Sequence, residues 1–547
     1  MNAAGFPGRP AACGPDWVRD AVFYQIFPDR FASSVRVPKP GTLERWDAPP
    51  TLHGFKGGDL LGIAEHLDDL RELGITALYL NPVFASASNH RYHTFDYERV
   101  DPLLGGDEAL RELIDAAHDR GMRIILDGVF NHASRGFWPF HHVLENGAAS
   151  PYRDWFYLDR EVLSGRRGLT AYPGANEIEA IRRFPSDDES TGTAGDPTGP
   201  ELVHPATPSE RVLGYQAWWD LPALPKLNHS NPAVREYVYG VVERWTRFGI
   251  DGWRLDVPEE IGEPGFWEEF RSRVLAIDTE SYLVGEIWNP APDWLAGDRF
   301  HALMNYPLTE AILSFTGAGR LDEELVSKTH EYSRHVRAID GPEFVRELAE
   351  VMATYPPEVT SLQLNLLDSH DTPRFISLAG GDATALRLAV LIQMTLPGAP
   401  CIYYGDEVGL EGREDPDCRR GYPWDVARQD RAMRDFVAGL TALRHANPVL
   451  RRGRFEPLAA EGSAVAYGMF DREDPAGRSI VVAMNAGGGP ARLNFEHPGL
   501  AGRLAQQVSW PGRGWSTAFA SRLLETGALE VELEAREGVV IEAVPNL

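Results

Sequence analysis

The amino-acid sequence predicts an α/β protein: a (β/α)8 TIM barrel with a domain inserted after the third strand and a C-terminal antiparallel β-sandwich. Apolar strands alternate with amphipathic helices between residues 21 and 445 in eight units, which is typical of a parallel sheet wrapped by helices. Two neighbouring strands, at 252–257 and 283–287, each run into a carboxylate. Catalytic groups of barrel enzymes gather at the C-terminal ends of the strands, so this arrangement also favours a barrel.

The expected elements of the barrel follow one another in the order strand, helix. The run at 21–31 is expected to hold the first strand, and a helix at 63–73 ends at Gly74, because glycine favours the position after a helix. A strand at 76–80 follows, and then a helix from 107 to 121. The remaining expected elements are a strand at 123–127, helices at 231–248 and 264–278, a sixth strand at 301–305, a helical segment at 308–352, strands at 361–367 and 400–404, and helices at 383–394 and 432–445.

The alternation breaks between residues 132 and 222, which are rich in Gly, Pro, Ser, Thr and aromatic residues. A segment that long inside a barrel is a functional loop or an inserted domain, and we expect it to wall the pocket. Low complexity at 186–200 predicts a mobile surface segment. From about residue 448, short alternating runs between Gly and Pro turns predict the β-sandwich. The expected domains are a flexible N-terminus at 1–16, the barrel at 17–132 and 223–447, the inserted domain at 133–222 and the C-terminal domain at 448–547.

Composition excludes several classes of function. A formal net charge of −27 disfavours nucleic acid or an anionic membrane as a partner, because both attract basic surfaces. Fourteen Trp and 18 Tyr side chains suit a neutral sugar, because flat rings stack on its apolar face. Three cysteines form no disulfide framework, and neither a signal peptide nor an apolar run of about 18 residues is present, so a cytoplasmic location is expected.

Asp256 and Glu286 are the candidate catalytic residues. They end neighbouring strands, so we expect them to lie together, about 5 Å apart, as in a retaining glycosidase where one carboxylate attacks the anomeric carbon and the other transfers the proton. Arg254, two residues before Asp256, is expected to orient that carboxylate and keep its pKa low. Glu286, beside Trp288 and without an obvious cation, is expected to have a raised pKa. The competing interpretation is two acids that merely stabilise helix N-termini.

Polar residues at other strand ends complete the constellation. Asp371 can bind sugar hydroxyls and favour the positively charged transition state, and His132 and His370 can donate hydrogen bonds to the same sugar. The alternative for Asp127, His132, His370 and Asp371 is a metal site, since Asp and His are common ligands. These residues lack the compact spacing of known metal motifs, and a metal gives Arg254 no role, so we favour the sugar site.

From about Trp17 onward, the chain resembles the α-amylase superfamily, glycoside hydrolase family 13. The resemblance rests on four motifs in order: Asp127-Gly-Val-Phe-Asn-His132, Gly252-Trp-Arg-Leu-Asp-Val257, Gly285-Glu-Ile-Trp288 and Leu367-Asp-Ser-His-Asp371. It implies the barrel, an inserted B domain and a C-terminal β-sandwich. It also implies that Asp256 is the nucleophile, Glu286 the acid/base and Asp371 the transition-state stabiliser. Around the bound glucose, the resemblance places Asp127, His132, Arg254, His370 and Tyr92, the last of which resembles a tyrosine that stacks on the sugar.

Within the superfamily, three features resemble the neopullulanase, cyclomaltodextrinase and maltogenic amylase group. They are Leu224-Pro-Lys-Leu-Asn228, Asp415-Pro-Asp-Cys-Arg-Arg420 and Glu260, and the resemblance implies that Glu260 binds substrate. This implies hydrolysis of α-1,4 bonds in short malto-oligosaccharides or cyclodextrins, with some α-1,6 cleavage. Transfer or isomerisation of the sucrose or trehalose type, with the same carboxylates, remains the alternative. A barrel that only binds or transports sugar is disfavoured because all three acids are present.

The sequence also departs from that group. The barrel is expected to start close to residue 1, so we expect this chain to lack the N-terminal β-sandwich of the group, and either a monomer or a homodimer is compatible with the sequence. Residues 32–35 lack the acidic, Asn-rich calcium loop, so we expect no required cofactor, and Asn131 is the candidate ligand if Ca²⁺ binds. Glu259 and Glu260 stand where typical α-amylases carry a Lys-His pair, which favours oligosaccharide trimming over starch degradation.

Overall fold

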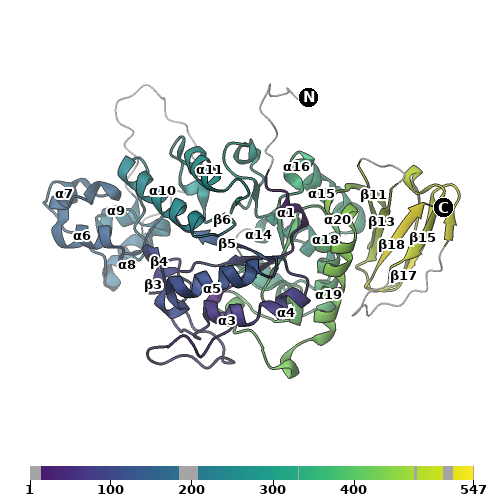
Figure 1. Cartoon of the computed structure of the whole chain (residues 1–547), viewed down its shortest axis with the longest axis horizontal. Helices are drawn as coiled ribbons and strands as arrows, with labels where there is room; N and C mark the ends of the chain where they lie inside the picture. The colour runs from purple at the N-terminus through teal and green to yellow at the C-terminus, as the bar shows by residue number, and fades with distance from the viewer. Residues whose placement is uncertain (1–13, 184–206, 330–331, 473–476, 509–521, 546–547) are drawn as a thin grey trace.

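A computed structural model describes residues 14–183, 207–329, 332–472, 477–508 and 522–545 (Figure 1). Most of the expected flexible N-terminus and the low-complexity segment at 186–200 lie outside these residues. Within the described residues, no helix combines the length and the apolar character that crossing a bilayer requires.

The central sheet is a closed parallel barrel, as predicted. Among the described residues it has eight strands in the spatial order β8-β7-β6-β5-β2-β1-β10-β9, and a parallel bridge from Met304 to Leu364 joins the first strand of this order to the last. The strands are β1 (Phe23–Ile26), β2 (Ala77–Leu80), β5 (Arg123–Gly128), β6 (Gly252–Leu255), β7 (Tyr282–Gly285), β8 (Ala302–Leu303), β9 (Leu364–Leu366) and β10 (Ala399–Tyr403). Side chains such as Phe23, Tyr79 and Ile125 fill the barrel interior, as expected of a packed core rather than a pore.

Helices cover the outside of the barrel (Figure 1). Side chains cap the N-termini of several helices. The side-chain oxygens of Asn231, before α10, and Asp382, before α18, accept hydrogen bonds from backbone N–H groups of the first turn. The longer covering helices are α5 (Gly106–His118), α10 (Pro232–Arg247), α11 (Phe266–Ile277), α12 (Tyr306–Thr316), α15 (Gly341–Ala353), α18 (Ala383–Thr395) and α19 (Arg431–Ala446).

Some of the predicted helix and strand boundaries are wrong. The first predicted strand stops at Ile26, and Pro28 starts the short helix α2 (Pro28–Phe31), because proline suits the first turn of a helix. The helix expected at 63–73 is divided at His66 into α3 (Leu60–Glu65) and α4 (Leu67–Glu72). The helical segment expected at 308–352 is several helices, since α13 (Glu323–Lys328) and α14 (Tyr332–His335) stand between α12 and α15.

The insertion after β5 lies at one end of the molecule (Figure 1, left). Its described part holds the helices α6 (Trp138–Asn146), α7 (Arg160–Leu163), α8 (Ala175–Arg183) and α9 (Pro208–Leu213), which the weak periodicity of the sequence did not predict. Single β-bridges from His132 to Lys226 and from Phe156 to Leu227 tie the start of the insertion to the chain that returns to the barrel. The insertion therefore stands directly over the end of β5.

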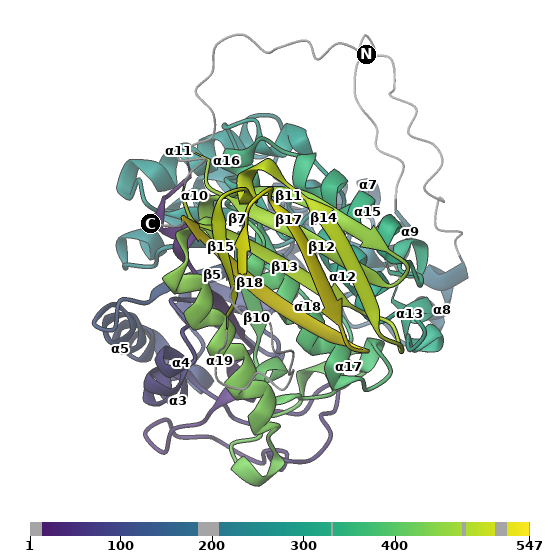
Figure 2. The ribbon, with the colours of Figure 1, turned by 90° about the vertical axis from the view of Figure 1, so that its right-hand side faces the viewer.

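The C-terminal region is an antiparallel β-sandwich at the other end of the molecule (Figure 1, right), and it faces the viewer in Figure 2. In the described chain, a six-stranded sheet in the order β11-β12-β13-β18-β15-β16 faces the pair β14-β17, and apolar residues of both, such as Val481 and Val531, form one core. The strands are β11 (Arg454–Glu461), β12 (Ala464–Phe470), β13 (Ser479–Asn485), β14 (Ala491–Glu496), β15 (Arg503–Gln507), β16 (Arg522–Leu524), β17 (Ala528–Leu533) and β18 (Glu537–Pro545).

Candidate active site

Arg254 is the centre of the polar cluster at the C-terminal end of the barrel. Its Nη1 lies 2.8 Å from Oδ1 of Asp127 and 2.9 Å from Oδ1 of Asp256, and its Nη2 lies 2.7 Å from Oε2 of Glu286. Asp127 and Arg254 are register partners on β5 and β6, and Asp256 and Glu286 directly follow β6 and β7. The barrel geometry therefore brings the two predicted catalytic carboxylates to one guanidinium.

The residue after Asp256 has an unusual backbone conformation. Val257 has φ 35° and ψ 56°, in the left-handed region that a β-branched residue rarely adopts. In this conformation its N–H donates a hydrogen bond to Oε2 of Glu286, over 3.2 Å. Strained residues persist where the surroundings hold them, commonly at functional sites, and this strained residue links the end of β6 to the carboxylate that follows β7.

Burial dominates the protonation of the two acids. It raises the pKa of Glu286 to about 7, as predicted, while the nearby Arg254 opposes the shift. It also raises the pKa of Asp256 well above the usual value, and Arg254 only partly offsets this. Two predictions are thus wrong: the pKa of Asp256 is not low, and Glu286 does have a cation beside it. The two carboxyls share one cation and influence each other, so they titrate as a pair.

Tyr92 and His370 extend the cluster on the far side of Asp127. Oδ2 of Asp127 accepts hydrogen bonds from the hydroxyls of Tyr79, at 2.8 Å, and Tyr92, at 2.7 Å. The Tyr92 and His370 rings are parallel, with centroids 5.1 Å apart, and the Tyr92 hydroxyl also meets Nε2 of His370. The Gln25 amide lies 3.0 Å from Nδ1 of His370 and can donate to it, which leaves the ring proton on Nε2. Burial lowers the pKa of His370 well below its usual value, so the ring is neutral.

Asp371 is the most exposed of the three predicted catalytic acids. Its Oδ2 lies 3.0 Å from Nε2 of His370, and its Oδ1 lies 3.3 Å from Nη2 of Arg419. Arg419 also donates from Nε to the His370 backbone carbonyl, over 2.8 Å. The sequence placed Arg419 in a family-like motif but gave it no role. The structure shows that it holds both the third acid and the neighbouring histidine.

His132 and Asn131 stand at the inserted-domain side of the site. Burial lowers the pKa of His132 to about 3, so the ring is neutral. Its ring stacks on Trp218, with centroids 4.7 Å apart, and among the described residues its Nε2 has no hydrogen-bond partner. The side-chain oxygen of Asn131 likewise has no partner among them. His132 lies five residues beyond Asp127, close to the start of the insertion.

Glu260 lies at the rim of the site rather than in its centre. Its Oε2 is 2.8 Å from Nζ of Lys226, which belongs to the motif at 224–228, and its side chain is 41% exposed. Because His132 and Lys226 form a β-bridge, the pair lies beside the histidine that was predicted to bind sugar. The Glu260 carboxylate can therefore contact a part of a bound ligand that extends beyond the buried charged cluster.

The geometry of the described residues offers no support for the alternative of a metal site. In the part of the chain that the structure describes, no group of three or more His, Cys, Asp or Glu side chains is arranged to hold a metal ion. Both carboxylate oxygens of Asp127 are already engaged, by Arg254 and by the two tyrosines. The unpartnered Asn131 oxygen is an amide without such a cluster beside it, so the competing metal interpretation gains no support.

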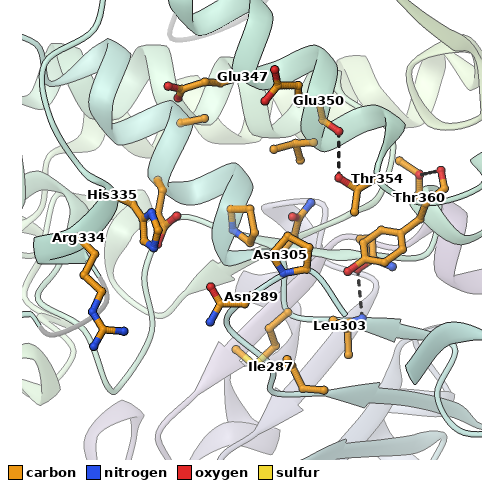
Figure 3. A pocket seen from close by; sticks show the side chains of 18 of the residues that line it. Ile287, Asn289, Leu303, Asn305, Arg334, His335, Glu347, Glu350, Thr354 and Thr360 are labelled. Atoms are coloured by element: carbon orange, nitrogen blue, oxygen red, sulfur yellow. Dashed lines mark hydrogen bonds between the residues drawn. The ribbon is translucent and has the colours of Figure 1, made fainter. Parts of the chain in front are cut away.

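A recess of about 420 Å³ borders the segment that follows Glu286, since Ile287 is one of its lining residues (Figure 3). Glu347 and Glu350 of α15 approach it from one side, and Ile287 and Asn305, from the segments after β7 and β8, line the other. Neither Asp256 nor Glu286 is among its lining residues. The candidate active site is therefore identified by its buried charged residues and not by the volume of this recess.

Comparison with known proteins agrees with this geometry. Residues 25–451, more than half of the chain, match the alpha amylase catalytic domain. The chain belongs to the α-amylase family. It is accordingly a glycoside hydrolase of that family, and both the recognised resemblance and the barrel with its C-terminal β domain are confirmed.

The relatives of this α-amylase family member act on α-glucans. A cyclomaltodextrinase from a Bacillus species is 40% identical over 475 residues, which cover 86% of this chain and 73% of that protein. Neopullulanase 2 from Thermoactinomyces vulgaris is 39% identical over 455 residues, 83% of this chain and 67% of that protein. The crystal structure of a debranching enzyme from Nostoc punctiforme is 40% identical, with a TM-score of 0.79, and covers 97% of this chain and 100% of that one.

Proposed function

We propose that the enzyme is a retaining α-glycosidase that hydrolyses α-1,4 bonds, and some α-1,6 bonds, in short malto-oligosaccharides or related α-glucans. The contact of Arg254 with both Asp256 and Glu286 carries this proposal, since it brings the two acids together at one end of the barrel. The names of the relatives, a cyclomaltodextrinase, a neopullulanase and a debranching enzyme, support the linkages and the substrate class.

The proposed reaction is a double displacement. Asp256 attacks the anomeric carbon while Glu286 gives its proton to the departing glycosidic oxygen, which leaves a covalent glycosyl ester on Asp256. Glu286, now a carboxylate, takes a proton from water as the water attacks the same carbon and releases Asp256. Arg254 disperses the negative charge of the two acids as it moves between them. Asp371 faces the oxocarbenium-like transition state, held by His370 and Arg419.

The test combines two variants with a substrate panel. Asp256→Asn and Glu286→Gln are each expected to lower turnover on maltotriose by roughly 10³-fold or more while leaving the thermal unfolding midpoint near that of the wild type. Glu236→Gln, on the exposed face of α10, is the control and is expected to keep the wild-type turnover, because the Glu236 side chain is 63% exposed and pairs with Arg273 away from the site. A drop below tenfold for either catalytic variant would contradict the assigned roles. The panel comprises maltose, maltotriose, cyclodextrin, pullulan, isomaltose, sucrose and trehalose.

Transfer to a sugar acceptor is the second candidate function. The pair of Lys226 and Glu260 favours it, because the Glu260 side chain is 41% exposed at the rim and can bind an acceptor hydroxyl in competition with water. Products from maltotriose separate the two reactions. Glucose and maltose as the main products indicate hydrolysis, whereas longer oligomers or rearranged disaccharides in excess would make transfer or isomerisation the main reaction.

A further inference from the structure

A column of three aromatic rings leads from the candidate active site to the surface. His132 stacks on Trp218 at 4.7 Å with an angle of 7° between the rings, and Trp218 stacks on Trp219 at 4.7 Å with an angle of 16°. Trp219, the outermost ring, is 76% exposed. A large apolar side chain with one face packed and the other open is a ready surface for a flat ligand.

The backbone holds Trp219 in a conformation that it would not adopt by default. Trp219 has φ 51° and Asp220 has φ 55°, both in the left-handed region that side chains other than glycine rarely occupy. Surrounding hydrogen bonds impose this turn. Oδ1 of Asp220 accepts from the Ser209 N–H at 2.8 Å, and the Trp218 N–H donates to the Leu224 carbonyl at 2.9 Å. Such strain is retained where a function compensates for it.

Two polar atoms of the column lack partners. Among the described residues, neither Nε1 of Trp218 nor Nε2 of His132 makes a hydrogen bond, although both atoms are buried. Buried polar atoms are nearly always paired, so an unpaired one calls for a group that the protein itself does not supply. Sugar hydroxyls, which both donate and accept, match an indole N–H and a neutral imidazole nitrogen.

We propose that Trp219 binds a glucosyl ring of the substrate outside the reactive position, and so sets the preference for longer chains. This inference rests on the proposed function, because it assumes an α-glucan in the site. The apolar face of the sugar packs on the free face of the indole, as sugars do on aromatic rings. Leu221, which is 45% exposed and follows in the same turn, extends the apolar surface.

The test compares a long and a short substrate. Trp219→Ala is expected to lower kcat/KM on maltohexaose by about tenfold, the size of one stacking contact, and to leave kcat/KM on p-nitrophenyl α-glucoside unchanged. Trp219→Phe keeps a ring and is expected to stay within about threefold of the wild type on both. Trp138→Ala is the matched control, since Trp138 is 62% exposed on α6 and, among the described residues, its ring pairs edge-on with His142 rather than stacking on another aromatic face. An equal loss on both substrates, or none on maltohexaose, would overturn the proposal.

A binding measurement separates this inference from the proposed function. Titration of maltohexaose into Glu286→Gln, alone and combined with Trp219→Ala, is expected to show an affinity about tenfold weaker in the combined variant. If the wild type turns over neither substrate, the proposed hydrolysis fails whatever the titration shows. If the wild type is active and the two titrations agree, the role of Trp219 fails on its own.

Discussion

Nη2 of Arg254 lies 2.7 Å from Oε2 of Glu286. Because the same guanidinium also meets Asp256 through Nη1, at 2.9 Å, one rigid cation fixes the spacing of the two acids. Arginine presents its donors in a planar fork, which lysine cannot reproduce. The relationship makes Arg254 the residue on which the geometry of the pair depends.

Arg254→Lys is expected to lower kcat on maltotriose on the order of 10²-fold, because the positive charge remains but the fixed donors are lost. Arg273→Lys is the control, since Arg273 forms an exposed network with Glu236 and Glu269 away from the site. Both variants are measured by steady-state kinetics and thermal unfolding. A loss of less than threefold in a well-folded Arg254→Lys variant would show that charge alone suffices.

The rate is expected to fall above neutral pH. Burial raises the pKa of Glu286 to about 7 in the free protein, and the first step needs this acid protonated, so kcat/KM should drop about tenfold per unit as pH rises well beyond 7. Below pH 7 Glu286 keeps its proton, so any acidic limb reports the nucleophile. A pH series of kcat/KM on maltotriose checks this. A rate that is flat or rising between pH 7 and 9 would remove Glu286 from the role of acid.

Substitution of Gly252 and of Gly240 by alanine is expected to change the free energy of unfolding in opposite directions. A Cβ on Gly252 would lie 2.2 Å from the Tyr282 carbonyl oxygen of the neighbouring strand, so Gly252→Ala is expected to destabilise the fold by about 3 kcal/mol or more. Gly240 lies within α10 with nothing near its Cβ position, so Gly240→Ala should stabilise by about 0.5–1 kcal/mol. Chemical denaturation measures both, and equal effects would contradict the close strand approach.

Removal of divalent metal ions is expected to leave both turnover and the thermal unfolding midpoint unchanged. The candidate ligand Asn131 has a buried amide oxygen, but no metal-binding cluster of His, Cys, Asp or Glu lies within the described ranges. Calcium sites need several oxygen ligands. Turnover and the unfolding midpoint are therefore compared before and after EDTA treatment. A fall that added Ca²⁺ reverses would show a site that these residues do not reveal.

The sequence predicts the barrel and the strand-end acids well, since both depend on local patterns. Asp256 and Glu286 follow buried strands, and parallel strands must deliver their ends to one side. The contact of Arg254 with Glu286 is not predictable from spacing, because it depends on how far adjacent strands are staggered. The raised pKa of Asp256 also requires knowing how deeply the site is buried.

The secondary structure of the inserted domain is the part of the fold that sequence patterns predict least well. Its helices are short, and their periodicity is interrupted by Gly and Pro. The turn at Trp219 shows the limit clearly. Two left-handed residues without glycine have no sequence signature, so neither the turn nor the stacking of Trp218 on His132 can be anticipated.

Labelling of the nucleophile tests the account most directly. An α-glucosyl fluoride that also carries fluorine at C5 should react in the first step and be released slowly, because the electron-withdrawing atom destabilises the oxocarbenium-like transition state. After proteolysis, mass spectrometry is expected to find one glycosyl group on the peptide that contains Asp256, and none in Asp256→Asn. A label on the Glu286 or Asp371 peptide, or an active enzyme that never acquires a label, would contradict the double displacement at Asp256.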